Sequence, residues 1–274
     1  MKKVVCLALC LFASISFSKD LVEAKLPRTE FGSEVFIRGL LDKAPASNGR
    51  ILLLFRGYPG IARIGDTGRG GRGPFLQDYF EDMIPTLLAA GISTVTVDCP
   101  TDQWRQGCSD AYRSSKQHAD DVAALLTALR NAGDFSQIFM LGHSYGAVST
   151  HWLSLNMGNA LAGVIHSSTQ SKANKFFNAD LAASMARFSS SEVAIPYIYL
   201  HHKDDLCDLT PYEYAFNNAK DGAITTVTGG DRSGAACGAG SFHGFAGARP
   251  MVAAALAKWI NHREVTPTVA GKPD

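Results

Sequence analysis

A serine flanked by glycines is the feature of this chain that points most directly to chemistry. The pentapeptide Gly142-His143-Ser144-Tyr145-Gly146 follows an apolar run at 138–141 and precedes a stretch with helical character at 147–155. It matches the pattern G-x-S-x-G, in which a sharp strand-to-helix turn exposes a nucleophilic serine. The turn strains the serine backbone, and side chains at the two glycines would collide. We therefore expect Ser144 to be a nucleophile at a helix N-terminus.

The motif alone is a weak signal, because glycine and serine are abundant in this chain. Its assignment depends on a base that can accept the serine proton. His243 lies in a glycine-rich loop, 240–245, between the last predicted strand and the last predicted helix. Such a loop can carry an imidazole back to the nucleophile, so we expect His243 to be the base; the alternative is a surface loop histidine. We expect the side chain of His143 to point away from the strand-to-helix turn at 142–146, which is called the elbow below. The other histidines are less suitably placed: His118, His151, His166, His201, His202 and His262.

A carboxylate is needed to fix the tautomer of that histidine and to stabilise its charged form. Three aspartates follow the predicted strand 197–201 and lie between serine and histidine in the sequence: Asp204, Asp205 and Asp208. The spacing from the strand end favours Asp205 as the acid, and Asp204 and Asp208 remain alternatives. Asp98, at the end of an earlier strand, is a further alternative for the acid, although we favour a role in which it caps or anchors the loop around Cys99.

An oxyanion intermediate needs two hydrogen-bond donors. The backbone N–H of Tyr145, directly after the serine, is the expected first donor. The second should come from Arg56-Gly57-Tyr58-Pro59-Gly60, which follows the predicted strand 51–55. Because Pro59 has no N–H, we expect Tyr58 to be that donor.

These segments, with Ser241-Phe242-His243-Gly244, resemble the α/β-hydrolase superfamily, and the order of nucleophile, acid and histidine matches. The resemblance covers essentially all of the chain after residue 18. It implies an α/β fold with a mostly parallel, eight-stranded sheet, and a triad of Ser144, His243 and Asp205 that needs neither metal nor cofactor. Arg56 departs from the family pattern, which often has histidine there. The resemblance also places a short, polar lid at 167–194.

Apolar strands alternate with amphipathic helices along the chain, which indicates a parallel sheet with helices on both faces in a single domain, 19–274. The predicted strands are 34–40, 51–55, 92–97, 138–141, 161–166, 197–201 and 224–228, and the predicted helices are 79–90, 116–131, 211–219 and 249–261, with another after the elbow.

The first residues are typical of a secretory signal peptide, with a basic start, an apolar run and small residues near Ser18. We expect residues 1–18 to be removed and the protein to be exported, periplasmic or secreted, with no stable membrane span. An uncleaved anchor or a buried first helix is the alternative.

Of the six cysteines, Cys6 and Cys10 lie in this segment, which leaves Cys99, Cys108, Cys207 and Cys237. An even number in an exported chain indicates disulfides, and four cysteines allow three pairings. We favour Cys207–Cys237, which would tie the acid loop to the histidine loop, together with Cys99–Cys108. Four unpaired thiols are the alternative, and none of the spacings is typical of zinc.

The net charge is +1 and the basic residues are scattered, so nothing indicates a nucleic-acid partner. The glycine-rich loop 57–74 carries Arg63, Arg69 and Arg72 but lacks the ending of a phosphate-binding loop.

The expected triad and oxyanion donors together predict a carboxylesterase-like serine hydrolase for a small-molecule acyl substrate. The alternatives are a serine peptidase or thioesterase of the same fold, and a catalytically silent binding protein. The sequence leaves the substrate and the oligomeric state open.

Overall fold

The computed structural model describes residues 19–69, 79–105, 107–174 and 181–272. The predicted signal peptide and Arg72 lie outside these residues. Within the described part of the chain, no helix has the length and apolar character to cross a membrane.

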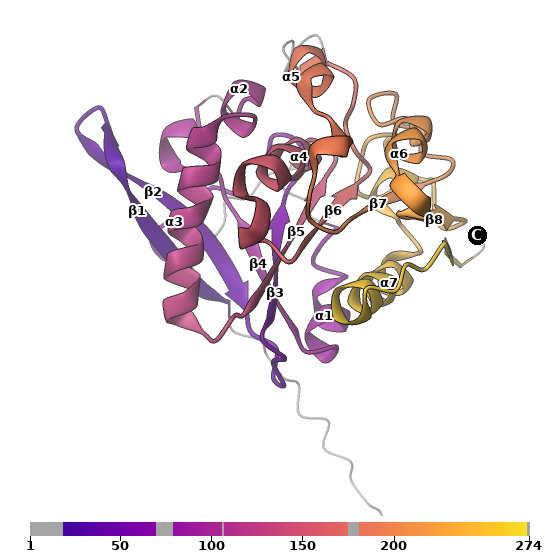
Figure 1. Ribbon diagram of the computed structural model, residues 1–274, viewed down its shortest axis with the longest axis horizontal. Coiled ribbons are helices and arrows are strands. Elements are labelled where there is room, and N and C mark those ends of the chain that lie inside the picture. Colours follow the sequence, from indigo (N-terminus) through magenta and orange to yellow (C-terminus); the bar gives the residue numbers. More distant parts are fainter. Residues whose placement is uncertain (1–18, 70–78, 106, 175–180, 273–274) are drawn as a thin grey trace, which may run out of the picture.

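The described strands form one nine-stranded sheet in the order β1-β2-β4-β3-β5-β6-β7-β8-β9 (Figure 1). Strands β1 and β2 are antiparallel to their neighbours, and the remaining pairs are parallel. The mostly parallel sheet is therefore confirmed, with nine strands in place of the expected eight. The strands are β1 (Asp20–Glu30), β2 (Ser33–Asp42), β3 (Arg50–Phe55), β4 (Ile92–Val97), β5 (Gln137–His143), β6 (Gly163–Ser167), β7 (Tyr197–His202), β8 (Ile224–Thr228) and β9 (Thr268–Ala270).

The two edge strands were not predicted from the sequence. Strand β1 carries charged residues and Pro27, and its pairing with β2 shifts register between Lys25 and Thr29. A proline is tolerated in an edge strand because only one side of that strand pairs with a neighbour. Strand β9 has only three residues, too few for a periodic pattern.

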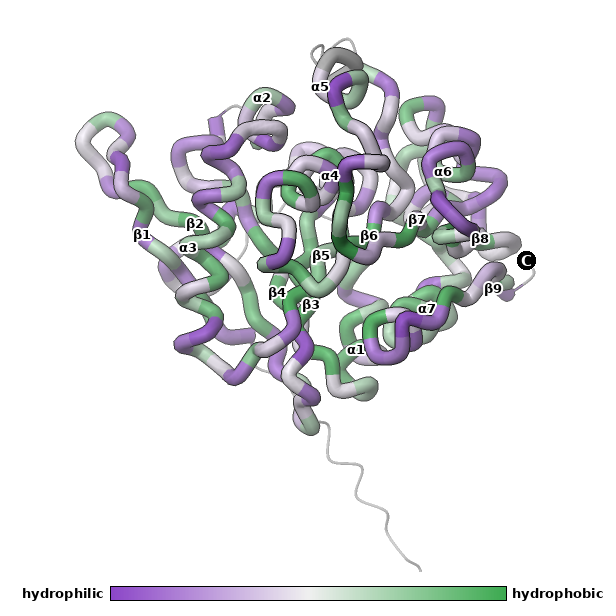
Figure 2. The backbone as a smooth tube through the Cα atoms, viewed as in Figure 1, coloured by the Kyte–Doolittle hydropathy of each residue, from purple (hydrophilic) through white to green (hydrophobic). Residues whose placement is uncertain are grey.

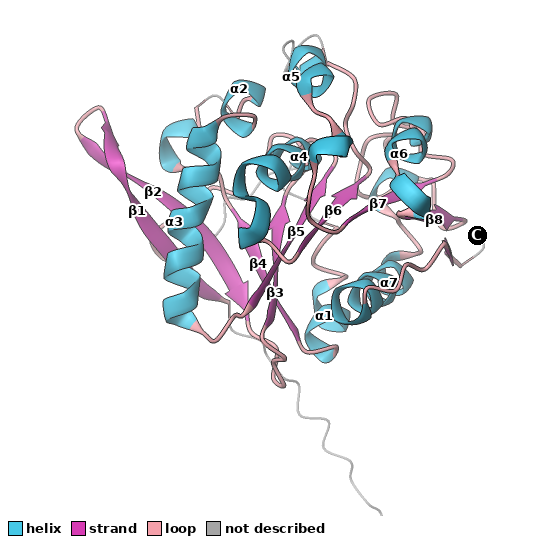
Figure 3. Ribbon diagram, viewed as in Figure 1, coloured by secondary structure: helices cyan, strands magenta, loops and turns pink. Residues whose placement is uncertain are grey.

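Helices cover both faces of the sheet (Figure 3). Helices α1 and α7 pack on one face, while α3, α4 and α6 pack on the other. The helices are α1 (Ile84–Ala89), α2 (Asp110–Arg113), α3 (Lys116–Ala132), α4 (Gly146–Met157), α5 (Leu181–Arg187), α6 (Tyr212–Asn218) and α7 (Arg249–His262).

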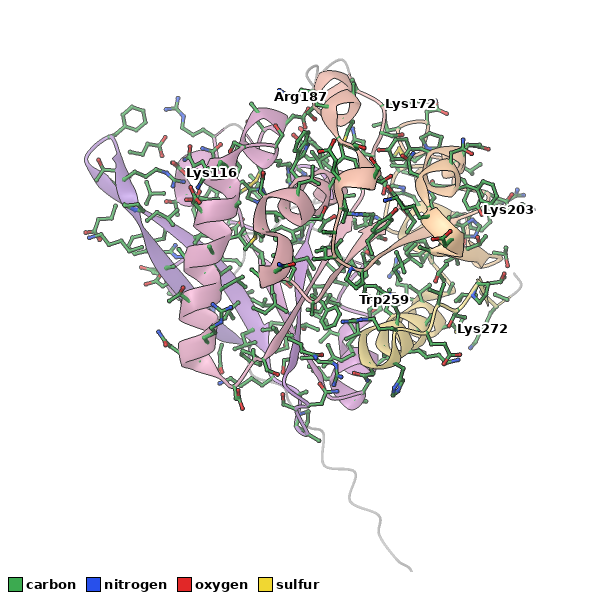
Figure 4. The ribbon with its side chains drawn as sticks, in the orientation of Figure 1. Lys116, Lys172, Arg187, Lys203, Trp259 and Lys272 are labelled. Atoms are coloured by element: carbon green, nitrogen blue, oxygen red, sulfur yellow. A yellow bond between two sulfur atoms is a disulfide. The ribbon has the colours of Figure 1, made fainter. Side chains whose placement is uncertain are left out.

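Successive residues of the central strands alternate between two hydrophobic cores. In β3, Leu52 and Leu54 face α1 and α7, whereas Ile51 and Leu53 face α3. Trp259 of α7, labelled in Figure 4, packs edge-on against Phe139 of β5 in the first core. The hydropathy colours of Figure 2 follow the same arrangement, with hydrophobic residues along the central strands. The continuous apolar run at 51–55 is thus buried on both faces, as the sequence predicts.

Helix α1 is shorter than the predicted 79–90 and begins at Ile84. Pro85 lies in its first turn, the only part of a helix that tolerates a residue without an N–H. Tyr79 and Phe80 form turns before the helix and are buried, 3% and 1% exposed. Because α1 begins after Tyr79, this residue is not part of the helix, and its ring contacts the candidate site described below.

The loops after β3, β5, β7 and β8 emerge at one edge of the sheet, because these strands are parallel. This edge carries the three loops that contain Ser144, Asp205 and His243. The segment 167–194, expected to be a lid, contains α5, and its residues 175–180 lie outside the described residues.

Candidate active site

Ser144 occupies the turn between β5 and α4, with a φ of 53° in the left-handed region. A non-glycine residue there costs on the order of 1 kcal/mol. The Ser144 N–H donates to the carbonyl of Ser167 at 2.9 Å, and its own carbonyl accepts from the N–H of Ala147 at 3.0 Å. Ser144 is partly exposed, whereas the other residues of the pentapeptide are buried. The turn therefore presents the serine side chain at the strand-end edge.

The flanking glycines are required by close backbone approach. A Cβ added to Gly146 would collide with the carbonyls of Phe55 and Arg56 at the end of β3. A Cβ added to Gly142 would collide with the carbonyl of Gly146. Any side chain at these positions would force α4 away from the sheet.

His243 lies in a 3₁₀ turn, η6 (Phe242–Gly244), and its Nδ1 is 3.0 Å from Oδ2 of Asp205. Both side chains are buried, at 3% and 0% exposed. A carboxylate only accepts hydrogen bonds, so Nδ1 of His243 carries the proton. In the neutral ring Nε2 then has a free lone pair, the arrangement that a general base requires.

Asp205 is surrounded by further donors. The backbone N–H of Cys207 donates to Oδ1 at 2.9 Å, and the hydroxyl of Thr210 donates to Oδ2 at 2.9 Å. His201 Nε2 lies 3.4 Å from Oδ2 and 2.9 Å from the carbonyl of Thr210. Burial alone would raise the pKa of Asp205, but the hydrogen bonds from His201 and His243 hold it below the usual range. The carboxylate therefore stays ionised.

The other two aspartates of this loop are not part of the cluster. Asp204 and Asp208 are exposed, and the structure brings only Asp205 of the three to His243. The structure also reveals partners that sequence reasoning missed. From the sequence, His201 is only one of several less suitably placed histidines, and Thr210 belongs to no motif that would identify it.

The end of β6 joins the serine loop to the histidine loop. The carbonyl of Ser167 accepts the Ser144 N–H, and the hydroxyl of Ser168 donates to the carbonyl of His243 at 3.0 Å. Adjacent residues thus hold the backbones of both groups, and their relative position depends on one rigid strand end.

His143 packs against the candidate base instead of reaching the serine. Its ring centroid lies 4.8 Å from that of His243 and 4.1 Å from that of Tyr79. Its Nδ1 lies 3.2 Å from the hydroxyl of Ser167. Burial, with a smaller contribution from repulsion by His243, holds the pKa of His143 well below its usual value. His143 therefore supports the His243 ring as a neutral group.

The loop after β3 lies beside the serine. A Cβ added to Gly57 would be 3.3 Å from the Cβ of Ser144. The N–H of Gly60 donates to the carbonyl of Gly57 at 2.7 Å, which closes a turn around the cis Tyr58–Pro59 bond. The ring centroids of Tyr58 and Tyr145 lie 6.2 Å apart, so the side chains of the two residues that are expected to supply oxyanion donors lie close together.

Asp98 also holds the loop after β3 in place. Its carboxylate accepts the N–H groups of Ala62 and Ile64 at 2.7 Å and that of Cys99 at 2.8 Å. Burial raises its pKa to about 6, although these bonds and the nearby Arg56 oppose the shift. Asp98 is thus the anchor of the Cys99 loop that the sequence predicts, and Arg56 takes part in this charged arrangement.

Two disulfides brace the strand-end loops. Cys207 pairs with Cys237, and Cys99 pairs with Cys108, with Cα–Cα distances of 4.6 and 5.9 Å. The first bond joins the Asp205 loop to the loop that leads into His243. Among the described residues, no group of three or more His, Cys, Asp or Glu side chains could hold a metal ion.

We expect Gly146→Ala to disrupt the elbow, because its Cβ would collide with the carbonyls at the end of β3. The variant should lose about 3 kcal/mol of unfolding free energy, the upper end of the range typical of overpacked buried positions. Gly65→Ala is the matched control, since its Cβ would meet only the Arg69 carbonyl at 3.8 Å. Urea unfolding of both variants measures the difference, and equal stabilities would contradict the packing argument.

The lowered pKa of Asp205 predicts a pH-dependent contribution to stability. Its folded pKa lies below the reference value of 3.8, so the stabilisation is present above about pH 4 and is lost as pH falls toward the folded value. Asp205→Asn should therefore be less stable than wild type at pH 6, and the gap should narrow by pH 3. Urea unfolding at both pH values tests this, and a constant gap would show that the carboxylate is not stabilised.

The Cys207–Cys237 disulfide should stabilise the fold and the site together. Replacing both cysteines by serine should remove about 2–4 kcal/mol of unfolding free energy. Turnover should also fall at temperatures where the variant remains folded, because the disulfide holds in place the loop whose backbone N–H at Cys207 donates to Asp205. Full turnover in a folded double variant would show that the bond does not support the site.

Comparison with known proteins shows which fold this arrangement belongs to. No protein-family model matches the chain, and no curated protein matches it. Among solved structures, Est1E from Butyrivibrio proteoclasticus has a TM-score of 0.58 at 13% identity, covering 90% of this chain and 99% of that chain. Dienelactone hydrolase from Anabaena variabilis ATCC 29413 has a TM-score of 0.58 at 15% identity, covering 90% and 98%. Proline iminopeptidase from Mycobacterium smegmatis has a TM-score of 0.53 at 11% identity, covering 89% and 98%. The sheet order, the elbow and these similarities together identify the fold of this chain as that of the α/β-hydrolase superfamily.

Proposed function

We propose that this protein is a serine hydrolase that cleaves an ester or related acyl bond, with Ser144 as nucleophile, His243 as base and Asp205 as the acid that orients it. The contact between Asp205 and His243 is the main support for this proposal. The ionised, buried Asp205 holds the proton of His243 on Nδ1, which leaves Nε2 to accept a proton at the edge where Ser144 is exposed.

The proposed reaction has two stages. Ser144 Oγ attacks the acyl carbon while His243 Nε2 takes the serine proton, and the N–H groups of Tyr145 and Tyr58 donate to the oxyanion. Collapse of the intermediate expels the alcohol, which receives the proton from His243. A water molecule, deprotonated by the same histidine, then attacks the acyl-enzyme and releases the acid and the free serine.

The substrate class follows from the site and not from the fold, because one fold hosts many reactions. The solved structures with this fold include proteins named Est1E, dienelactone hydrolase and proline iminopeptidase. We propose a small acyl substrate, since the segment 167–194 is short and polar. We also propose that the protein is exported, because its two disulfides persist best in an oxidising compartment.

Removal of either reacting group should abolish turnover. In assays with p-nitrophenyl acetate and butyrate, Ser144→Ala and His243→Ala should each lower kcat by about 10⁴–10⁶. The double variant should be little worse, because the groups act in one step. Additive losses, or wild-type turnover that does not depend on Ser144, would contradict the assignment.

A fluorophosphonate probe distinguishes an enzyme from a silent binding protein. Wild type should be labelled at Ser144 and Ser144→Ala should not, since labelling needs an activated serine. Aminoacyl nitroanilides tested beside the esters would show whether peptide bonds are preferred. Absence of labelling in folded wild-type protein would overturn the proposed function.

A further inference from the structure

Arg113, the last residue of α2, places a guanidinium directly behind the proposed oxyanion hole. Its side chain is 2% exposed. The guanidinium carbon lies 4.4 Å from the ring centroid of Tyr145, the residue whose N–H is one proposed donor. Its Nη2 also contacts Gly60, since a Cβ added to that glycine would collide with this nitrogen. One side chain therefore contacts both segments that would supply the oxyanion donors.

Hydrogen bonds fix the guanidinium between these segments. Its Nε donates to the carbonyl of Cys108 at 2.8 Å, and Nη1 donates to the hydroxyl of Ser149 on α4 at 2.5 Å. A planar fork can make both bonds and stack on a ring at the same time, whereas a lysine ammonium is a single point charge. Arg113 thus links α4, the loop after β3 and the disulfide-closed loop that contains Cys108.

Burying a positively charged side chain in the protein interior is energetically unfavourable. Burial lowers the pKa of Arg113, while Tyr145 and Asp110 act in the opposite direction. Well-packed apolar side chains often replace buried charges without loss of stability. The positive charge has, however, the sign that favours an anion forming at the Tyr145 N–H. The buried carboxylate of Asp110 offsets part of this charge, so the contacts that Arg113 makes matter more for the site than its charge.

We propose that Arg113 is a positioning residue, which holds the Gly57–Gly60 turn and the Tyr145 N–H at the separation that an oxyanion requires. The inference rests on the proposed hydrolase function. It goes beyond that function because it assigns Arg113 a role through its contacts with Tyr145, Gly60, Cys108 and Ser149, and not through the reacting atoms.

Steady-state kinetics of Arg113→Met and Arg113→Lys test the proposal, with Arg130→Met on the exposed face of α3 as the matched control. The substrates are p-nitrophenyl butyrate and its thiono ester, whose sulfur accepts oxyanion hydrogen bonds poorly. We expect Arg113→Met to lower kcat on the oxygen ester by about 10–100-fold, somewhat less than complete loss of one donor. KM should change by less than about threefold. The ratio of kcat for the oxygen ester to kcat for the thiono ester should fall by about the same factor as kcat for the oxygen ester. Arg113→Lys should recover only part of this loss.

Thermal unfolding accompanies each measurement, so that folding and positioning are separated. Folded Arg113 variants with unchanged kcat, or with an unchanged preference for the oxygen ester, would overturn the proposal. Failure of both variants to fold would also overturn it, because Arg113 would then be a structural residue. If wild type shows no turnover that depends on Ser144, the proposed function itself fails and the inference falls with it. Wild-type turnover with fully active Arg113 variants refutes the inference alone.

Discussion

The contact between Gly146 and the carbonyl groups at the end of β3 is the constraint on which the candidate site depends. It lets α4 begin directly against the sheet, so that the chain must reverse within Ser144. The serine consequently adopts a left-handed conformation that it would avoid in a free peptide. The same contact places Tyr145 beside the loop after β3, where Gly57 packs on Ser144. The hydrophobic cores on both faces of the sheet supply the free energy that maintains this strain.

The second requirement is that the buried charges keep their partners. The Asp205 side chain is 0% exposed, and a carboxylate in that position would be protonated without donors around it. Thr210, Cys207 and the two histidines provide those donors. The same physical rule applies behind the oxyanion loop, where Asp98 accepts three backbone N–H groups. Asp205 and Asp98 both follow the ends of strands, at the edge of the sheet where the chemistry is proposed to occur.

The elements that were easiest to predict are those whose local pattern agrees with their tertiary environment. Strands β4 and β8 match their predicted limits of 92–97 and 224–228, because each is a compact β-branched run. Predictions failed where one residue or a partner strand decided the outcome. Pro85 delays the start of α1, and β1 is a strand only because β2 pairs with it.

Local patterns and chain order were enough to predict the central strands, the elbow at Ser144, and a short choice of acids and bases. Only the tertiary structure selected Asp205 over its neighbours, by burying it against His243 while Asp204 stays exposed. It also revealed His201, Thr210 and Arg113 as partners of the site. These roles have no sequence signature, because they arise from distances between atoms whose residues are far apart in the chain, and packing alone sets those distances.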